Sequence, residues 1–346
     1  MNRLGGISLV AILALASVIL LFPPNIHDNN DSLRELHRIA KPYAFSFISW
    51  ELRALSSLGR EIVCRQSESF RQTELRNQIR AVLRDSGITV FPPIVFRVEK
   101  PPYLLVVSPR EKIVYLHRIV LRWDLSVEEM ERLEKQVDEL GLSSLVVELG
   151  GVGGTYPTIV GEHLSVTDTI DTVIEEWLHQ YLAFRPLGFL YLLDSLGIRR
   201  DADIVTINET LADMVSKEVG SVVRARYYGN EEPLKTGGDT PGFDFDAEMR
   251  ETRRKVDEYL SQGDIEKAER YMEERRKQFM AHGYHIRKLN QAYFAFHSIY
   301  AQDPASVSPI YEDLKELRAR SPSVKHFLDK VAVMKSYSEL TRALRD

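Results

Sequence analysis

The chain has 346 residues, of which 44% are hydrophobic and 27% charged, and its formal net charge is -5. This composition indicates a globular protein large enough for more than one packed unit. Its 45 basic and 50 acidic residues are interspersed, so the charge pattern gives no reason to expect nucleic acid as a partner. Cys64 is the single cysteine, which excludes an intrachain disulfide and a cysteine-based zinc site.

The N-terminal segment predicts a membrane anchor. No charged residue occurs between Arg3 and Asp28, and residues 4–22 form a continuous apolar run. At ~1.5 Å per residue, such a run would be ~28 Å long as a helix, close to the thickness of a bilayer core. A cleaved signal peptide is the alternative. We expect residues 1–26 to be an uncleaved single-pass anchor at the cell membrane, with the main domain extracytoplasmic.

Helices and strands are then predicted to follow in an α+β, mostly α arrangement. Residues 27–90 are predicted to be a helical N-terminal region, and a capping box of Ser126 and Glu129 starts a helix over residues 126–140. β-branched and aromatic residues between turn signals predict four strands, over residues 91–98, 103–108, 112–121 and 145–149.

A glycine-rich stretch, GGVGG at residues 150–154, follows the last of these strands. A phosphate-binding loop would need a Lys-Ser/Thr pair and a helix next, whereas residues 155–160 (TYPTIV) are typical of an extended segment. We therefore expect a turn between strands, with an edge strand running beside the helix that follows.

That helix, predicted over residues 167–184, concentrates the polar chemistry of the chain. Its apolar residues recur at helical spacing and predict one broad buried face. Glu175, Glu176 and His179 fall together on the opposite face. Thr167 or Asp168 is expected to cap its start, and Pro186 with Gly188 to end it.

Further helices are predicted over residues 203–226, over a charged pair within 247–281 that turns at 262–264, and over an apolar segment at 289–300. Residues 229–242 (GNEEPLKTGGDTPG) are typical of a linker. The predicted organisation is therefore an anchor (1–26), a helical N-terminal region (27–90), a core of sheet and two site helices (91–228), a linker (229–242) and a C-terminal helical subdomain (243–346).

Two short motifs indicate a metal site. Glu176-x-x-His179 places a carboxylate and an imidazole one helical turn apart. On the helix over residues 203–226, Glu209 and Asp213 share a face. The pairing of these two helices resembles the gluzincin metallopeptidases, in which the first helix reads His-Glu-x-x-His and the second supplies a third zinc ligand.

The resemblance is closer to a group of uncharacterised bacterial membrane-linked proteins of predicted zincin-peptidase type, and it covers roughly residues 145–340. The matching segments are EEWLHQYL (175–182), RPLG (185–188), the helix from NET (208–210) to KEVG (217–220), GGVGGTYP (150–157) and RKLNQAYFAF (287–296).

This resemblance implies a zincin-like core and a role for each site residue. His179 and Glu209 would be metal ligands, and Glu176 the base that deprotonates the attacking water. Asp213 and Asn208 would not bind the ion themselves but would hydrogen-bond to ligand side chains and fix their orientation. The chain departs from the family pattern at the first histidine, where it has Glu175. A glutamate can bind zinc through oxygen, and an oxygen-rich site also suits Mn²⁺ or Fe²⁺.

Two functions stay open at this point. The first is a membrane-anchored metallopeptidase that acts on a peptide or protein substrate, with Glu175, His179 and Glu209 holding a divalent ion, zinc by resemblance. The second is a catalytically inactive relative without metal, which binds peptides or proteins. By residue type, the candidate donors to the oxyanion of the peptidase reaction are Tyr191, Tyr228, His285, Tyr293 and His297.

Overall fold

The computed structural model describes residues 31–45, 70–152, 156–195, 197–229 and 242–345. Within them the chain is α+β and mostly helical, with two small sheets, in agreement with the predicted class. The expected linker lies mostly outside the described residues.

The expected membrane localisation is contradicted. None of the helices in the described part of the chain is both long enough and apolar enough to cross a bilayer. The segment expected to be the anchor, residues 1–26, lies outside the described residues.

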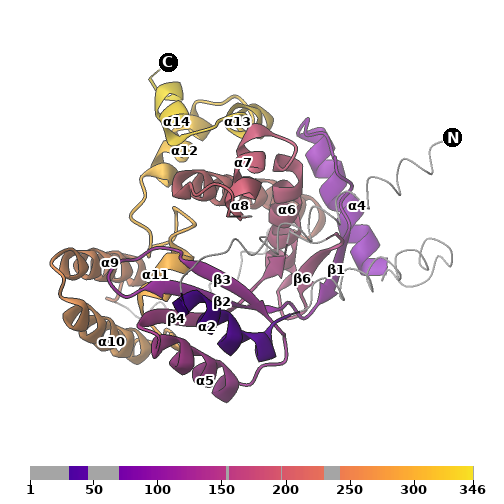
Figure 1. Ribbon diagram of the computed structural model, residues 1–346. Helices are drawn as coiled ribbons and strands as arrows, with labels where there is room; N and C mark the ends of the chain where they lie inside the picture. Colours follow the sequence, from indigo (N-terminus) through magenta and orange to yellow (C-terminus); the bar gives the residue numbers. More distant parts are fainter. Residues whose placement is uncertain (1–30, 46–69, 153–155, 196, 230–241, 346) are drawn as a thin grey trace.

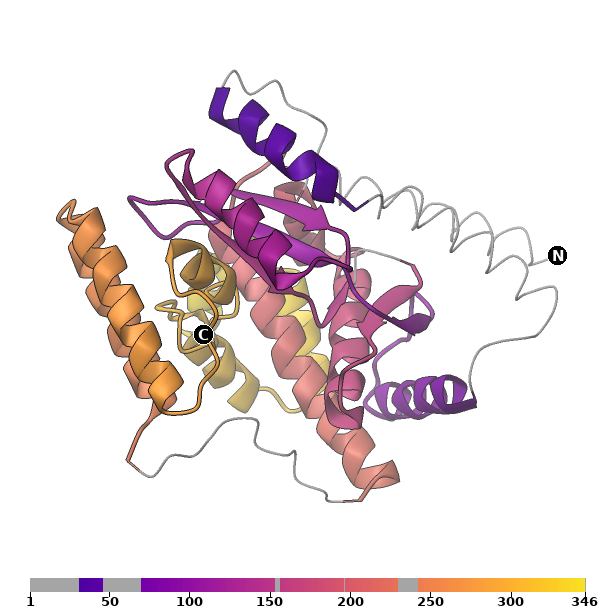
Figure 2. The same ribbon diagram turned by 90° about the horizontal axis from the view of Figure 1, so that it is seen from below.

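Sheet A has three strands in the order β3-β2-β4, and both strand pairs are antiparallel. Successive side chains of a strand point to opposite faces, so the side chains of β2 pack in two layers, one on each face of the sheet. Leu105 and Val107 pack with α2 and α5, whereas Leu104 and Val106 pack with α11. Figure 2 shows α2 and α5 over the near face of this sheet. The elements are β2 (Tyr103–Pro109), β3 (His117–Leu121), β4 (Leu142–Glu148), α2 (Asp31–Ala40), α5 (Val127–Asp138) and α11 (Gln291–His297), with the short 3₁₀ helix η1 (Lys41–Tyr43) after α2.

Sheet B also has three strands, in the order β1-β6-β5. β1 (Phe96–Glu99) pairs in parallel with β6 (Thr158–Gly161), and β6 pairs antiparallel with β5 (Gly151–Val152). The start of the glycine-rich stretch, expected to be a turn, is therefore itself a strand; residues 153–155 lie outside the described part. Among the described residues, β5 forms one edge of the sheet.

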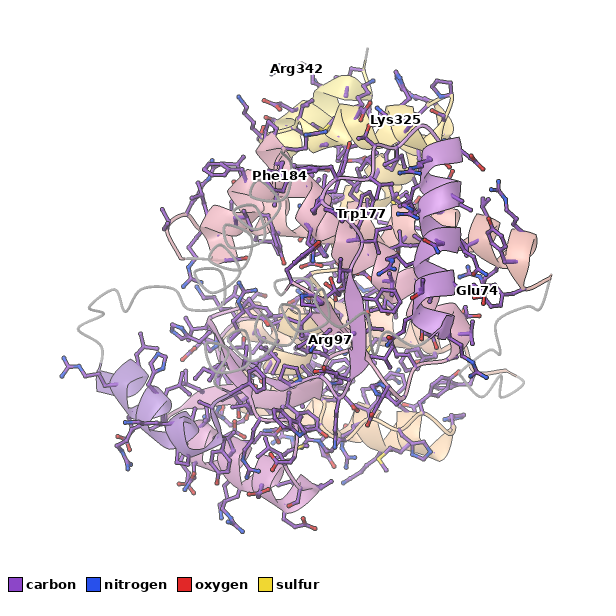
Figure 3. The ribbon with its side chains drawn as sticks, turned by 90° about the vertical axis from the view of Figure 1, so that its right-hand side faces the viewer. Glu74, Arg97, Trp177, Phe184, Lys325 and Arg342 are labelled. Carbon is purple, nitrogen blue, oxygen red and sulfur yellow. The ribbon has the colours of Figure 1, made fainter. Side chains whose placement is uncertain are left out.

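The largest core lies between helices above sheet B (Figure 1). Its centre is α6 (Val166–Leu182), whose fully buried Trp177 donates from Nε1 to the carbonyl of Pro92 at 2.8 Å. Figure 3 shows Trp177 beside α4. The other helices of this core are α4 (Phe70–Asp85), α7 (Pro186–Ser195), α8 (Ala202–Tyr227), α12 (Ile310–Ala319), α13 (Val324–Ala332) and α14 (Tyr337–Ala343).

The predicted charged helix pair is present as α9 (Phe245–Ser261) and α10 (Ile265–Ala281), which pack through their own apolar cluster. Arg110 after β2 donates to both carboxylate oxygens of Glu269 at 2.7 and 2.6 Å, which ties the pair to sheet A. Residues 243–346, expected as one helical subdomain, contribute to three clusters: α9 and α10 to this one, α11 also to the cluster on sheet A, and α12–α14 to the core around α6.

Candidate metal centre

The two helices that the sequence singled out lie side by side. α6 begins after Ser165, whose hydroxyl accepts from the backbone N–H of Asp168 at 3.1 Å, so Ser165 is the cap in place of Thr167 or Asp168. α8 begins after Asp201, whose carboxylate accepts from the N–H of Ile204 at 3.2 Å. Both starts are therefore fixed locally by a side-chain oxygen.

α6 and α8 run antiparallel. Asp171 near the start of α6 binds Arg224 near the end of α8 at 2.6 Å, while His179 near the end of α6 meets Glu209 near the start of α8. Glycine at position 220 leaves room for the first contact, because a Cβ there would lie 1.9 Å from Oδ1 of Asp171 and the carboxylate would have to shift. The helices are thus held together at one end by an ion pair and meet at the other through the candidate site.

Glu175, His179 and Glu209 converge between these helices. Each offers one ligand atom, and these atoms all lie within 4.8 Å of one another. The side chains of His179 and Glu209 are only 13% and 9% exposed. Two carboxylates and an imidazole this close could bind a metal ion. We call Glu175, His179 and Glu209 the metal group.

The hydrogen bonds of His179 define the orientation of its ring. Its Nδ1 lies 2.8 Å from Oδ1 of Asn208, and its Nε2 lies 3.3 Å from Oε2 of Glu209. An amide oxygen can only accept, so Nδ1 carries a hydrogen and donates it to Asn208. A metal-binding histidine almost always donates its second N–H in this way, which leaves the other nitrogen for the ion.

Asn208 is held in this orientation at a cost. The residue is completely buried, and its amide nitrogen has no hydrogen-bond partner among the described residues. An unpaired buried donor costs about 1–3 kcal/mol. His179 needs only the amide oxygen of Asn208 as an acceptor. The unpaired amide nitrogen is therefore consistent with a residue whose role is to orient the ring of His179.

Tyr191 of α7 supports the same group from a third helix. Its hydroxyl donates to Oε1 of Glu209 at 2.8 Å, and its ring stacks on that of His179 with centroids 5.6 Å apart. The bond occupies one carboxylate oxygen and leaves Oε2 facing the imidazole. Tyr191 was expected only as an oxyanion donor, and the structure gives it a contact with a ligand residue instead.

The other four residues considered as oxyanion donors contact different partners. Tyr228 is exposed and donates to Gln78 at 2.9 Å, and His285 is exposed. Tyr293 and His297 pack on each other with ring centroids 4.2 Å apart, and His297 lies 3.0 Å from Asp303. None of these contacts joins them to the metal group.

Without a metal, the group shares protons. Burial raises the pKa of Glu175 to about 8, and the nearby Glu176 carboxylate adds to this effect. Burial alone would lower the pKa of His179, but the carboxylate of Glu209 outweighs it and raises the pKa to about 10. Burial acts to raise the pKa of Glu209, yet its contacts with His179 and Tyr191 hold it below its ordinary value.

Glu176 and Asp213 flank the metal group. Glu176 faces β5: a Cβ on Gly151 would lie 2.7 Å from Oε1 of Glu176, so the strand approaches this carboxylate closely because position 151 is a glycine. The strand beside the site helix is therefore β5, which lies within the stretch that was expected to be a turn. Asp213 pairs with Lys217 at 2.8 Å.

Two tyrosines that the sequence analysis passed over also lie near the group. Tyr300 follows α11, and its neighbour Ala301 donates from its backbone N–H to Thr210, next to Glu209, at 3.0 Å. Burial raises the pKa of Tyr300 well above its ordinary value, and the carboxylates of the group add to this. Burial also raises the pKa of Tyr115 to about 12. No short motif marks either residue, because long-range contacts place them.

No protein-family model, curated protein or solved structure matches the chain. The resemblance of its helix motifs to gluzincins therefore stands without support from similarity over the whole chain. The geometry of α6, α7 and α8 is what supports a metal centre in this chain.

Proposed function

We propose that the chain is a metal-dependent peptidase with a zincin-like core formed by α6, α8 and sheet B. The observation that carries the proposal is the setting of His179, whose Nδ1–H is bound by Asn208 while Nε2 faces Glu209 at 3.3 Å. Glu175 completes a set of two carboxylates and one imidazole within 4.8 Å. The sequence resemblance favours zinc, and the oxygen-rich set also suits Mn²⁺ or Fe²⁺.

A divalent ion in this group would polarise the carbonyl of a bound peptide and make a water molecule more acidic. Glu176 accepts the proton that the attacking water loses, and it delivers a proton to the leaving nitrogen. The water oxygen forms a bond to the carbonyl carbon, the C–N bond breaks, and the products are a carboxylate and an amine. We assign to the hydroxyl of Tyr300 the hydrogen bond to the carbonyl oxygen as negative charge develops on it, because Tyr300 is near enough for the carboxylates of the site to raise its pKa.

The resemblance of the helix motifs to gluzincin metallopeptidases favours a peptide as the substrate. The backbone of β5 lies against the proposed base, because a Cβ on Gly151 would lie 2.7 Å from Oε1 of Glu176.

The first test is metal content and affinity. The purified full chain is stripped with a chelator and titrated with Zn²⁺, Mn²⁺ and Fe²⁺ by calorimetry. We expect one ion per chain, and we expect His179→Ala to abolish binding. His326→Ala is the matched control, because His326 is exposed on α13. Absence of binding in the parent for every ion would contradict the proposal.

The second test is hydrolysis. With the preferred ion bound, the parent should cleave peptides, and Glu176→Gln should lower kcat by at least 10²-fold while metal affinity stays within a few-fold, since general acid–base catalysis contributes about 10²–10⁴-fold. Glu162→Gln is the control for the same chemical change at an exposed carboxylate. Equal losses in both variants would remove Glu176 from the mechanism.

One feature favours the alternative, a metal-free module that binds peptides. The charges around the site already compensate one another: His179 faces Glu209 at 3.3 Å and Lys217 pairs with Asp213 at 2.8 Å. Glu175, whose pKa is raised to about 8, can remain protonated near neutral pH. If the parent is inactive with every ion and Glu175→His creates activity, this alternative replaces the peptidase.

A further inference from the structure

Two arginines join the hairpin of β2 and β3 to the connection between α7 and α8. Arg118 of β3 donates from Nη2 to the carbonyl of Ser195, the last residue of α7, at 3.3 Å. Arg200 donates from Nη1 to the carbonyl of Leu116 at 3.5 Å. Both side chains are exposed. They therefore lie at the surface where these two loops meet.

Neither guanidinium has a carboxylate partner among the described residues, and each makes a hydrogen bond only to a backbone carbonyl there. The adjacent Arg199 differs, because it pairs with Asp201 at 2.8 Å. A guanidinium has five N–H donors, so Arg118 and Arg200 keep most of their donors for a ligand. Arg200 contacts the carbonyl of Leu116, two residues before Arg118, so the two guanidinium groups lie on neighbouring segments and together suit an anion with two oxygens.

Arg118 also lies close to the metal group. The residue it contacts, Ser195, is one helical turn beyond Tyr191, whose hydroxyl binds Glu209 at 2.8 Å. One turn of helix advances ~5.4 Å, which places the guanidinium on the order of 10 Å from the candidate ligands. Consistent with this, the positive charge of Arg118 acts to lower the pKa of Glu209 and of Tyr115.

The charge of the surrounding residues decides which end of a peptide would fit. Glu175, Glu176 and Glu209 make the centre acidic, and the nearby Lys217 is already paired with Asp213 at 2.8 Å. Arg118, by contrast, acts on Glu209 and has no carboxylate partner among the described residues. Guanidinium groups bind carboxylates through paired hydrogen bonds. An extended residue spans ~3.3–3.6 Å, so a chain end held by Arg118 would place a peptide bond one to three residues upstream at the centre.

We propose that Arg118, with Arg200 beside it, binds the C-terminal carboxylate of a peptide, so that the chain is an exopeptidase that removes short C-terminal fragments. This inference rests on the proposed peptidase function. It assigns the polarity of the substrate, and it predicts that a free C-terminus is required for tight binding.

The test uses binding, so it does not depend on turnover. The full chain with Glu176→Gln is titrated, with Zn²⁺ and without metal, against fluorescent hexapeptides of one apolar sequence in three forms: C-terminal acid, C-terminal amide, and amide with an internal aspartate. We expect the acid to bind at least tenfold more tightly than either amide. Added Arg118→Gln should reduce this preference to less than threefold, and Arg118→Lys should give an intermediate value.

Arg199→Gln, the matched control, should keep the full preference. The inference is overturned if the acid and the plain amide bind equally, if no form binds, if the internal aspartate replaces the C-terminal carboxylate, or if Arg118→Gln weakens all forms by the same factor. Failure of the proposed function looks different, because it appears as loss of metal binding or of hydrolysis in the chain with Glu176 intact.

Discussion

The proton sharing in the candidate metal centre predicts how the stability of the metal-stripped protein depends on pH. The pKa of Glu175 rises from 4.5 to about 8 on folding, and that of His179 rises from 6.5 to about 10. Both groups therefore hold a proton in the folded state at pH values where they have lost it in the unfolded state. A raised pKa means that the folded state binds more protons, so stability must fall as pH rises.

The size of this effect follows from the overlap of the two shifts. Glu175 contributes to the decline from about pH 4.5 to 8 and His179 from about pH 6.5 to 10, so both act between pH 6.5 and 8. Each proton contributes about 1.4 kcal/mol per pH unit. If the two groups together contribute only half of the full dependence, the free energy of unfolding still falls by about 2 kcal/mol between pH 6.5 and 8.

A bound metal contributes a stabilisation whose dependence on pH has the opposite sign. The ligands must be deprotonated to bind an ion, so binding releases protons and strengthens as pH rises. Urea unfolding at pH 6.5, 7.25 and 8, with chelator or with saturating Zn²⁺, measures both slopes. We expect the free energy of unfolding of the stripped protein to fall as pH rises. The difference in this free energy between the zinc-loaded and the stripped protein should increase over the same range. Glu175→Gln and His179→Gln should each remove part of the fall. A stripped protein whose stability is constant or rises over this range would refute the reasoning.

Three substitutions test the packing that builds the site. Gly188→Ala places a Cβ 2.1 Å from the carbonyl of Leu182, so α7 must move, and the free energy of unfolding measured in urea should fall by at least about 2 kcal/mol. Asn208→Ala removes the acceptor for His179, and competition with a chelator should show metal affinity lower by about 10–100-fold. Trp177→Phe removes a buried hydrogen bond and opens a small cavity. The thermal midpoint should therefore fall by an amount that corresponds to a loss of about 1–3 kcal/mol in the free energy of unfolding.

Controls separate these effects from general damage. Gly150→Ala should change stability by less than about 0.5 kcal/mol, because a Cβ there meets no atom within 4 Å. If Gly188→Ala is as stable as Gly150→Ala, the close approach of α7 to the end of α6 is not required. Metal affinity that is unchanged in Asn208→Ala would show that the ring of His179 is oriented by other contacts.

Local patterns were enough to predict the elements that carry the site. The apolar spacing of α6 placed Glu175, Glu176 and His179 on one face, and the capping box of Ser126 and Glu129 in α5 is present in the structure. The turn between α9 and α10 also follows from its own residues. These features depend on residues three or four apart, which a sequence displays directly.

Contacts between distant segments could not be predicted in this way. Tyr300 reaches the site because Ala301 binds Thr210, 91 residues earlier, and Arg118 does so because it binds Ser195, 77 residues later. The parallel pairing of β1 with β6 likewise joins segments that no short motif relates. Single tyrosines and arginines in apolar or mixed segments look ordinary until tertiary packing gives them neighbours.

The contact of Asp171 with Arg224 beside Gly220 has a consequence for how an ion would enter and leave. This clamp lies roughly 12 Å along α6 from His179, and it needs no ion to form. The spacing of α6 and α8 is therefore set before any ion arrives. Loading and exchange should proceed on the folded protein, at rates governed by access and by ligand deprotonation, so that one metal can replace another without passing through the unfolded chain.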